Sequence, residues 1–401
     1  MIFIRRITLP ALALLLVAAI PVRADKVDDF IGAEMGSRHI PGLSLAAVRD
    51  GRVIKAKGYG LANVELKVPA TPDSVYQIGS MTKQFTAAGI MLLVEEGKVS
   101  LDETIGNYLH DLPGAWRGVT VRHLLTHTSG IKDFADLADT ETERSKDYTK
   151  AQIIALVSGA PLEFRPGQKW NYSNTGYFLL GMIIERVSGK TYGQFLHDRI
   201  FSPLGMSATR LNNVNDIVPD RAAGYVLRDG RLYNGQPVNP THPYAAGALL
   251  STASDLAKWD AALYTERVLR ESSIKQIMTP TTLNDGRPAR NTYFNNYYGF
   301  GWFLGELGGH KYADHGGVIP GFTADIIRFS DDRITIIVLT NRSADEWLAP
   351  DAPRPWDIAK GVASLYIRTG GEGRITKSST GSLTNWTRAA IACFARSVCK
   401  S

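Results

Sequence analysis

Residues 80–94 read Ser-Met-Thr-Lys-Gln-Phe-Thr-Ala-Ala-Gly-Ile-Met-Leu-Leu-Val, and this stretch decides how the chain folds. From Phe85 to Val94 the residues are apolar on nearly every side of a helix, so we expect a helix buried in the interior. Gly97 is well placed to end that helix. Ser80 therefore lies at the mouth of a buried helix, which carries Lys83 inward.

The sequence predicts strands on both sides of this helix. Leu43–Val48 and Val53–Tyr59 flank Asp50-Gly51, a strong hairpin signal, so two antiparallel strands precede the helix. The predicted fold class is α+β: an antiparallel sheet built from both chain ends, flanked by helices, with a large and mainly helical insert. Further strands are expected at Gly299–Leu304, Phe322–Phe329 and Ile334–Leu339, and helices at Val27–Ser37, Ala151–Ser158, Gly176–Val187, Ser254–Tyr264 and Trp356–Ile367.

Residues 1–24 have the pattern of a secretory signal peptide. Arg5-Arg6 forms a positive n-region, Leu9–Ile20 an apolar stretch, and Val22-Arg23-Ala24 a small-residue cleavage site. An uncleaved membrane anchor is the alternative, but the apolar stretch is shorter than the ~20 residues that a spanning helix needs. We therefore expect a cleaved signal peptide and a periplasmic or secreted mature protein.

Composition and charge are those of a globular protein with basic ends. Of 401 residues, 44% are hydrophobic and 21% charged, which excludes a chain disordered throughout. The net charge is +6, of which residues 1–24 carry +3 and residues 370–401 carry +4. Residues 25–369 are therefore close to neutral, and their charge gives no reason to expect a nucleic-acid partner.

The mature chain is expected to form one large domain followed by a basic tail. The domain covers residues 25–369, with an α/β part at about 25–80 and 295–369 and a helical part at about 81–294. The tail, 370–401, holds both cysteines, so neither a disulfide framework nor a cysteine-built zinc site belongs to the domain. If residues 386–399 form a helix, Cys393 and Cys399 lie too far apart to bridge. Weak membrane contact through the tail is left open.

Ser80 and Lys83 are the first candidate catalytic residues. Positions i and i+3 share a helix face, so the amine of Lys83 lies beside the hydroxyl of Ser80. A serine hydroxyl is a poor nucleophile until a neighbouring base takes its proton. The same spacing from serine to lysine also occurs at Ser129, Ser272 and Ser397. Only Ser80 lies at the N-terminal end of a long buried helix, where backbone N–H groups favour a developing oxyanion.

Two further motifs carry chemistry. In Tyr172-Ser173-Asn174, a phenol near a lysine can relay a proton, and the asparagine amide can hold both the lysine and a substrate carbonyl. A second Tyr-x-Asn occurs at Tyr293-Phe294-Asn295. In His315-Gly316-Gly317, two glycines permit close backbone approach to a ligand, and the following N–H, that of Val318, is free to donate.

The order and spacing of these motifs resemble the serine β-lactamase and penicillin-binding-protein superfamily. The resemblance is closest to the class C β-lactamase-related esterases, D-peptidases and similar hydrolases. It covers roughly residues 26–368 and implies a β-lactamase/transpeptidase-like fold. Supporting segments are Val121–Gly130, Ala246–Asp255, Pro320–Thr323 and Val338–Asn341.

The resemblance implies a role for each candidate. Ser80 is the acylated nucleophile, Lys83 is its partner base, and Tyr172 is a general base or acid. Asn174 orients Lys83 and the substrate, while the N–H groups of Ser80 and Val318 form the oxyanion hole. Substrate binding is expected at Asn174, His315, Gly316, Gly317 and Val318. No metal or cofactor is implied.

A lysine or tyrosine base requires a lowered pKa. Both side chains ordinarily titrate near 10, so action at neutral pH costs ~4 kcal/mol, which burial and mutual proximity can supply. The protons of Lys83 and Tyr172 would be coupled, so the sequence does not assign the base to one of them.

Two departures from the family pattern bear on the substrate. β-Lactamases usually present Lys-Thr-Gly, whose lysine meets the substrate carboxylate, where this chain has His315-Gly316-Gly317; we expect His315 to be only partly charged at neutral pH. There is also no Glu-x-x-Leu-Asn segment, which supplies the deacylating glutamate of class A enzymes. We therefore expect an exported serine hydrolase acting on small-molecule or peptide substrates, through ester or amide (D-peptide or β-lactam-like) bonds, with β-lactamase activity not favoured.

Three rival interpretations remain. His123 and His127 are spaced like zinc ligands on a helix, but no glutamate between them could activate water, and a structural role is favoured. Asp314-His315 suggests a serine protease triad, yet neighbours on a strand point to opposite faces. The alternative function is a non-catalytic or weakly active relative that binds cell-wall peptides, against which the intact Ser80, Lys83 and Tyr172 argue.

Overall fold

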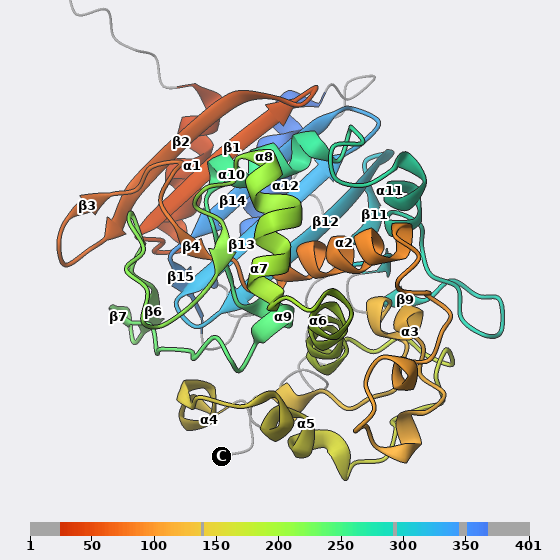
Figure 1. Ribbon diagram of the computed structural model, residues 1–401. Helices are drawn as coiled ribbons and strands as arrows, with labels where there is room; N and C mark the ends of the chain where they lie inside the picture. The colour runs from red at the N-terminus through yellow and green to blue at the C-terminus, as the bar shows by residue number, and fades with distance from the viewer. Residues whose placement is uncertain (1–24, 138–139, 292–294, 345–350, 368–401) are drawn as a thin grey trace, which may run out of the picture.

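A nine-stranded antiparallel sheet runs through the protein and contains strands from both ends of the chain (Figure 1). The computed structural model describes residues 25–137, 140–291, 295–344 and 351–367. The strand order is β3-β2-β1-β14-β13-β12-β11-β10-β9, and β1 pairs with β14 so that Leu45 lies opposite Val338. The predicted fold class is confirmed. The strands are β1 (Gly42–Arg49), β2 (Arg52–Asn63), β3 (Val68–Pro69), β9 (Arg290–Asn291), β10 (Asn296–Tyr298), β11 (Phe303–Leu307), β12 (His310–Ile319), β13 (Phe322–Phe329) and β14 (Ile334–Thr340).

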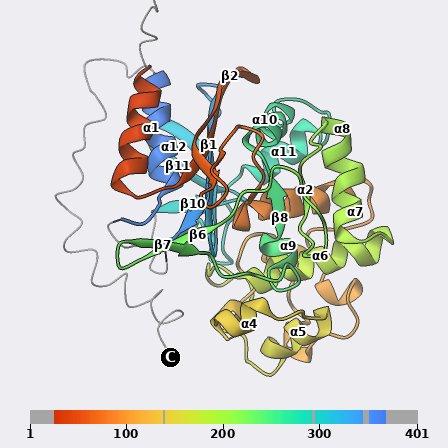
Figure 2. The same ribbon diagram turned by 90° about the vertical axis from the view of Figure 1, so that its left-hand side faces the viewer.

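Helices cover both faces of the sheet. α1 (Lys26–Ser37) and α12 (Pro355–Tyr366) lie on one face, and the helical insert lies on the other (Figure 2). The alternation along β1 follows from this arrangement, because successive side chains point to opposite faces. Leu43 and Leu45 belong to the apolar cluster under α1 and α12, whereas Ala46 and Val48 belong to the larger cluster under the insert.

The insert is mainly helical, as predicted, and α2 is its central helix. Every residue of α2 (Thr82–Glu95) from Thr82 to Leu93 is buried, and Gly97 follows it with a φ of +68°. The other insert helices are α3 (Val121–Leu125), α4 (Glu141–Ser145), α5 (Lys150–Ser158), α6 (Asn174–Ser188), α7 (Tyr192–Leu196), α8 (Ser202–Leu204), α9 (Tyr244–Gly247), α10 (Ala253–Ala262) and α11 (Glu271–Ile277). Short 3₁₀ helices are η1 (Gly79–Met81), η2 (Ile105–Asn107), η3 (Gly114–Trp116) and η4 (Phe134–Asp136), and η5 (His197–Phe201) is a π-helix.

Two small three-stranded sheets were not predicted from the sequence. One contains β15, β6 and β7, and its β6–β7 hairpin turns at Asp229-Gly230, a signal of the same kind as Asp50-Gly51. The other contains β4, β8 and β5. Their strands are β4 (Tyr76–Gln77), β5 (Arg210–Leu211), β6 (Tyr225–Arg228), β7 (Arg231–Asn234), β8 (Leu249–Ser251) and β15 (Arg342–Ser343).

The predicted strand Gly299–Leu304 is wrong for residues 299–302, and only Phe303 and Leu304 belong to a strand, β11. Residues 299–302 form the turn between β10 and β11, closed by a hydrogen bond from the Gly299 N–H to the Trp302 carbonyl at 2.9 Å. Gly301 has a φ of +75°, and a Cβ added there would lie 2.7 Å from the Lys83 carbonyl oxygen. A glycine is required because this turn packs directly on the backbone of α2.

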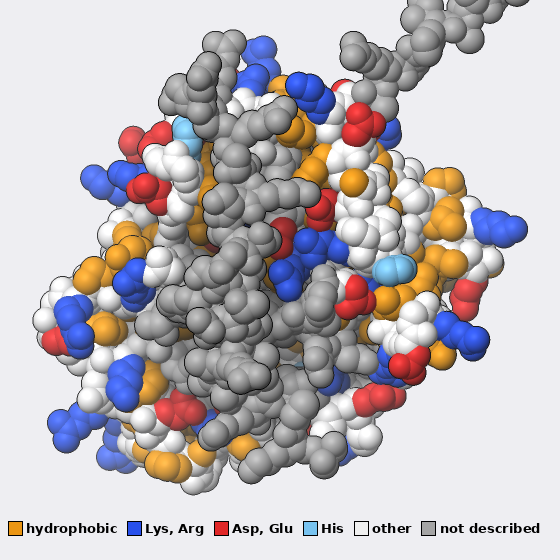
Figure 3. Space-filling view, turned by 180° about the vertical axis from the view of Figure 1, so that it is seen from behind, with side chains coloured by type: hydrophobic (Ala, Val, Ile, Leu, Met, Phe, Trp, Pro, Cys, Tyr) orange, Lys and Arg blue, Asp and Glu red, His pale blue; other side chains and the backbone are white. Residues whose placement is uncertain are grey.

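Basic and acidic side chains are interspersed over the visible part of the face in Figure 3, in agreement with the near-neutral charge of residues 25–369. Among the residues that the structure describes, no helix combines the length and the apolarity needed to cross a membrane. The predicted signal peptide, the tail with Cys393 and Cys399, and Tyr293 lie outside the described residues.

Candidate active site

Ser80 and Lys83 meet at the start of α2. Ser80 belongs to η1, and Lys83 lies in the first turn of α2, so that Lys83 Nζ and Ser80 Oγ are hydrogen bonded at 3.1 Å. The Ser80 side chain is partly exposed, whereas Lys83 is fully buried. The structure thus brings the predicted pair together, with the buried amine beside a partly exposed serine.

The Lys83 amine has two further hydrogen-bond acceptors. Nζ donates to Asn174 Oδ1 and to the Ala246 carbonyl oxygen of α9, each at 2.8 Å. Burial lowers the pKa of Lys83 to about 7. A neutral amine has two hydrogens and one lone pair. When both hydrogens are donated to Asn174 and Ala246, the lone pair is therefore left for the Ser80 hydroxyl.

Tyr172 lies on the other side of the amine. Lys83 Nζ is 4.8 Å from the centre of the Tyr172 ring, and the Tyr172 hydroxyl interacts with Ser80. Burial raises the pKa of Tyr172 well above its usual value, in the direction opposite to Lys83. Of the two residues that the sequence left open, Lys83 is therefore the better base, and Tyr172 is suited to pass on a proton as a neutral phenol.

The open edge of β12 lies against the Ser80 turn. β11 pairs with β12 only as far as Asp314, which leaves the later residues of β12 free at that edge. A Cβ on Gly317 would lie 1.9 Å from the Ile78 carbonyl oxygen and 3.1 Å from Ser80 N. A Cβ on Gly79 would lie 2.9 Å from Val318 N. The backbones that carry the Ser80 and Val318 N–H groups therefore touch, as an oxyanion hole built from both would require.

The expectation of a partly charged His315 is wrong. Its ring is buried, Nδ1 donates to the Gly316 carbonyl at 2.7 Å, and Nε2 accepts from the Tyr298 hydroxyl at 3.0 Å. Burial and the nearby Lys83 lower the pKa of His315 to about 3, so the ring is neutral at physiological pH. Sequence alone could not show this, because Tyr298 reaches His315 only through the pairing of β10, β11 and β12.

Gly316 and Asp314, the two neighbours of His315 on β12, face away from Ser80. A Cβ on Gly316 would contact the Ala324 carbonyl and Asp325 at 3.5 Å, on the α12 side of the sheet. Asp314 is buried on that side near Lys360 of α12. Asp314 and His315 therefore do point to opposite faces, which excludes the triad interpretation. Of the two glycines, only Gly317 lies against the Ser80 turn.

His123 and His127, the two histidines spaced like zinc ligands, lie in different surroundings. His123 Nδ1 accepts from the Thr120 N–H at 3.1 Å and caps α3. His127 has a φ of +57°, and its ring lies 4.2 Å from the ring of Tyr172. Among the described residues there is no group of three or more histidine, cysteine or acidic side chains arranged to hold a metal ion.

Several residues around the site were missed in the sequence. Asp133 accepts hydrogen bonds from Asn174, and nothing in its sequence neighbourhood, which also holds Lys132 and Asp136, marks it as part of the site. The rest are aromatic and surround Tyr172 and His315: Trp170, Tyr177, Tyr298 and Phe303. Aromatic residues of this kind are not distinguishable from core residues in a sequence.

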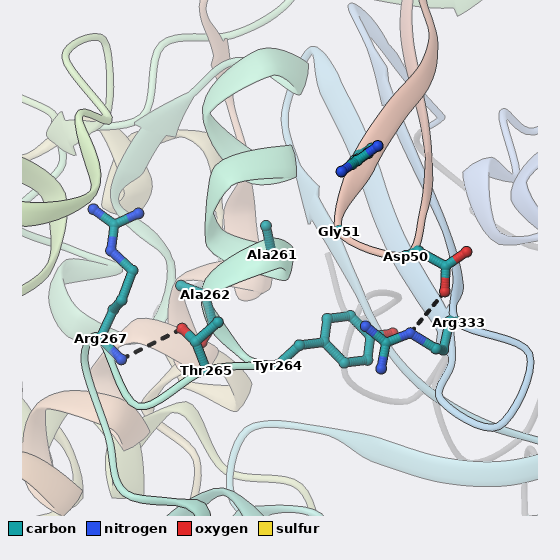
Figure 4. Close-up of a pocket in the computed structure, with 9 residues that line it drawn as sticks. Asp50, Gly51, Ala261, Ala262, Tyr264, Thr265, Arg267 and Arg333 are labelled. Carbon is teal, nitrogen blue, oxygen red and sulfur yellow. Dashed lines mark hydrogen bonds and ion pairs between the residues drawn. The ribbon is translucent and has the colours of Figure 1, made fainter.

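A separate hollow of about 320 Å³ lies where the β1–β2 and β13–β14 turns meet the end of α10 (Figure 4). None of the residues that line it belongs to the Ser80 site. Arg333 is paired there with Asp50 at 2.8 Å, and Arg267 points away from Arg333 (Figure 4). This hollow is therefore separate from the candidate site at Ser80.

A buried Ser-x-x-Lys helix, a Tyr-x-Asn segment beside the lysine and an open strand edge against the serine turn define a β-lactamase-type serine hydrolase. The Beta-lactamase family profile matches residues 27–359, and the chain belongs to this family. It is 32% identical over 329 residues to penicillin-binding protein 4* of Bacillus subtilis (78% of this chain, 70% of that protein). It is 27% identical over 324 residues to protein flp of Staphylococcus aureus strain MW2, covering 80% of this chain and 63% of flp.

Solved structures of a penicillin-binding protein homologue and of a D-amino acid amidase are also similar to this chain. The octameric penicillin-binding protein homologue from Pyrococcus abyssi is 34% identical with a TM-score of 0.73, covering 85% of this chain and 76% of that one. The D-amino acid amidase from Ochrobactrum anthropi SV3 is 28% identical with a TM-score of 0.74, covering 85% and 98%.

Proposed function

We propose that the protein is an exported serine hydrolase that forms an acyl-enzyme on Ser80 and cleaves ester or amide bonds. The observation that carries this proposal is the buried Lys83 amine, which is 3.1 Å from the Ser80 hydroxyl and whose pKa burial lowers to about 7. A serine hydroxyl becomes a nucleophile only when such a base takes its proton. A purely structural lysine would gain more from a carboxylate partner than from two neutral acceptors.

The proposed reaction has two halves. Lys83 takes the Ser80 proton while Oγ attacks the substrate carbonyl carbon, and the carbonyl oxygen accepts from the Ser80 and Val318 N–H groups. The carbon–leaving group bond then breaks, and the proton passes from Lys83 through Tyr172 to the leaving group. Water attacks the acyl-enzyme with the same residues acting in reverse, which releases a carboxylic acid and free Ser80.

The substrate is proposed to be a neutral or apolar ester or amide. Trp170, Tyr172 and Phe303 are partly exposed aromatic residues that lie beside one another near Ser80, with Tyr172 and Phe303 nearly parallel. They suit an apolar acyl or leaving group. The neutral His315 offers no charge to a substrate carboxylate, which disfavours penicillins. D-Amino acid amides are included because the Ochrobactrum enzyme is named for them.

The test is covalent labelling followed by a substrate panel. We expect a fluorophosphonate probe to label the purified protein, Ser80→Ala to abolish labelling, and Ser272→Ala to label normally, since Ser272 is an exposed serine with the same spacing to a lysine. The panel compares p-nitrophenyl esters, D-amino acid amides, D-Ala-D-Ala peptides and nitrocefin. A wild-type protein that neither labels nor turns over any of these would favour the non-catalytic peptide-binding alternative.

Export and membrane contact need their own measurements. N-terminal sequencing of the protein from a periplasmic or culture-medium fraction is expected to find a chain beginning at Asp25. Salt washing of membranes tests the tail, because binding of basic residues to anionic lipid is screened by salt.

A further inference from the structure

Asp133 holds Asn174 in place through hydrogen bonds to its backbone and its side chain. It precedes η4, and one of its carboxylate oxygens accepts from the Ala135 N–H at 3.2 Å. The other oxygen accepts from the Asn174 backbone N–H at 3.0 Å and from Asn174 Nδ2 at 2.9 Å. The carboxylate is thus bound to both donors of one residue, 41 positions later in the chain.

This contact decides which way the Asn174 amide points. A side-chain amide has a donor end and an acceptor end. Because Asp133 takes the donor end, the oxygen of Asn174 is left facing Lys83, to which it is bound at 2.8 Å. If the amide were reversed, its NH₂ group would face the amine and its oxygen would face the carboxylate, so both contacts would be lost.

The charge of Asp133 also acts on the amine. When Lys83 takes the Ser80 proton it becomes an ammonium in a buried site, and a negative charge one hydrogen-bonded residue away stabilises it. The other groups around Lys83 are Tyr172, Tyr177, His127 and His315, all of which burial keeps neutral. Asp133 itself faces Asp136 as well as Lys83, and burial raises the pKa of Asp133 to about 6, so it carries its negative charge at neutral pH and loses it toward pH 5.

We propose that Asp133 is a positioning residue of the hydrolase, which fixes the Asn174 amide toward Lys83 and supplies the negative charge that balances the Lys83 ammonium. This inference rests on the proposed function, since it assumes that Lys83 is the base. Asp133 is bound to Asn174, which in turn is bound to Lys83, so it acts through Asn174.

The test measures the rate of fluorophosphonate labelling of the full-length protein between roughly pH 5 and pH 9. The rate rises with pH as Lys83 loses its proton. Asp133→Asn removes the charge that favours the protonated amine, so the acid limb of the profile is expected to move to lower pH by roughly 0.5–1 unit. The maximal rate is expected to fall by roughly 10–100-fold, because a neutral amide at position 133 holds the Asn174 amide more weakly than a carboxylate does.

Two controls separate this role from a structural one. Asp136→Asn removes a neighbouring carboxylate, which lies in η4 and is bound to Lys132 at 3.0 Å, and it is expected to leave the profile in place. In an Asn174→Ala background, Asp133→Asn is expected to lower the maximal rate little further, because both changes break the same connection. Thermal unfolding of each variant checks that the protein is folded.

The outcomes distinguish this inference from the proposed function. A folded Asp133→Asn protein whose acid limb stays at the wild-type pH overturns the inference while leaving the hydrolase intact. A wild-type protein that does not label overturns both. If Asp133→Asn does not fold, Asp133→Glu decides, because it keeps the charge but displaces it: slower labelling with an unmoved acid limb supports the positioning role, and a wild-type rate overturns it.

Discussion

Replacing Gly317 by alanine tests the oxyanion hole directly. The new Cβ would lie 1.9 Å from the Ile78 carbonyl oxygen and 2.9 Å from the Ile78 carbonyl carbon. Both atoms are backbone, so no side chain can rotate away to make room. Either β12 or the turn that carries Ser80 must move, and the N–H groups of Ser80 and Val318 then separate.

The expected effects of Gly317→Ala on rate and stability follow from the loss of an oxyanion donor and from the overpacking. Removing one oxyanion donor typically costs ~10²–10³ in rate, and overpacking of this kind costs ~1–3 kcal/mol of stability. We therefore expect Gly317→Ala to slow fluorophosphonate labelling of Ser80 by roughly that factor while lowering the unfolding temperature by several degrees. The two measurements together show whether the protein is folded but inactive.

The neighbouring glycine provides the matched control. A Cβ on Gly316 would meet its nearest atoms at 3.5 Å, which is ordinary contact, on the α12 side of the sheet. Gly316→Ala is therefore expected to label within a few-fold of wild type. If Gly317→Ala labels as fast as Gly316→Ala, the close approach of β12 to the Ser80 turn does not control the reaction, and the reasoning fails.

Two further changes test the burial of charged groups. His315→Lys would place an ammonium in the buried site of a neutral ring near Lys83; we expect it to lower the unfolding temperature and not to improve penicillin binding, and a folded variant with tighter penicillin binding would contradict this. Between pH 4 and pH 8, Asp314→Asn should lose ~1–3 kcal/mol less stability than wild type. Burial raises the pKa of Asp314 from 3.8 to about 6, so wild type loses stability as pH rises through that window. Urea unfolding at both pH values measures it, and an equal difference at the two would refute the assignment.

Local signals predicted those parts of the fold that depend on neighbouring residues. The β1–β2 hairpin followed from Asp50-Gly51, and α2 followed from its apolar run and Gly97. The strand predicted to begin at Gly299, four residues before β11, shows the limit, because the aromatic and apolar residues there fit a strand as well as a turn. What decides the structure there is the approach of Gly301 to the Lys83 carbonyl, and that contact joins segments more than two hundred residues apart.

The candidate site divides in the same way. Ser80 and Lys83 could be paired from helical spacing alone, and the order of motifs supplied Tyr172, Asn174 and Val318. Asp133 could not be found, because its partner lies on α6 and nothing local marks the contact. Its role becomes visible only when the donor end of the Asn174 amide is assigned.

Burial lowers the pKa of both Lys83 and His315, but the consequence for the reaction differs between the two residues. This difference links the proposed mechanism to the substrate. The same loss of solvent lowers the pKa of Lys83 to about 7 and that of His315 to about 3. For Lys83 the change makes an effective base at neutral pH, because Ser80 lies within hydrogen-bonding distance. For His315 it removes the charge that a carboxylate-bearing substrate would need. In a more open site both side chains would be more often protonated. His315 could then offer a positive charge to a carboxylate, but Lys83 could no longer act as a base. In the proposed mechanism, the environment that activates Ser80 would therefore also favour neutral esters and amides over penicillins.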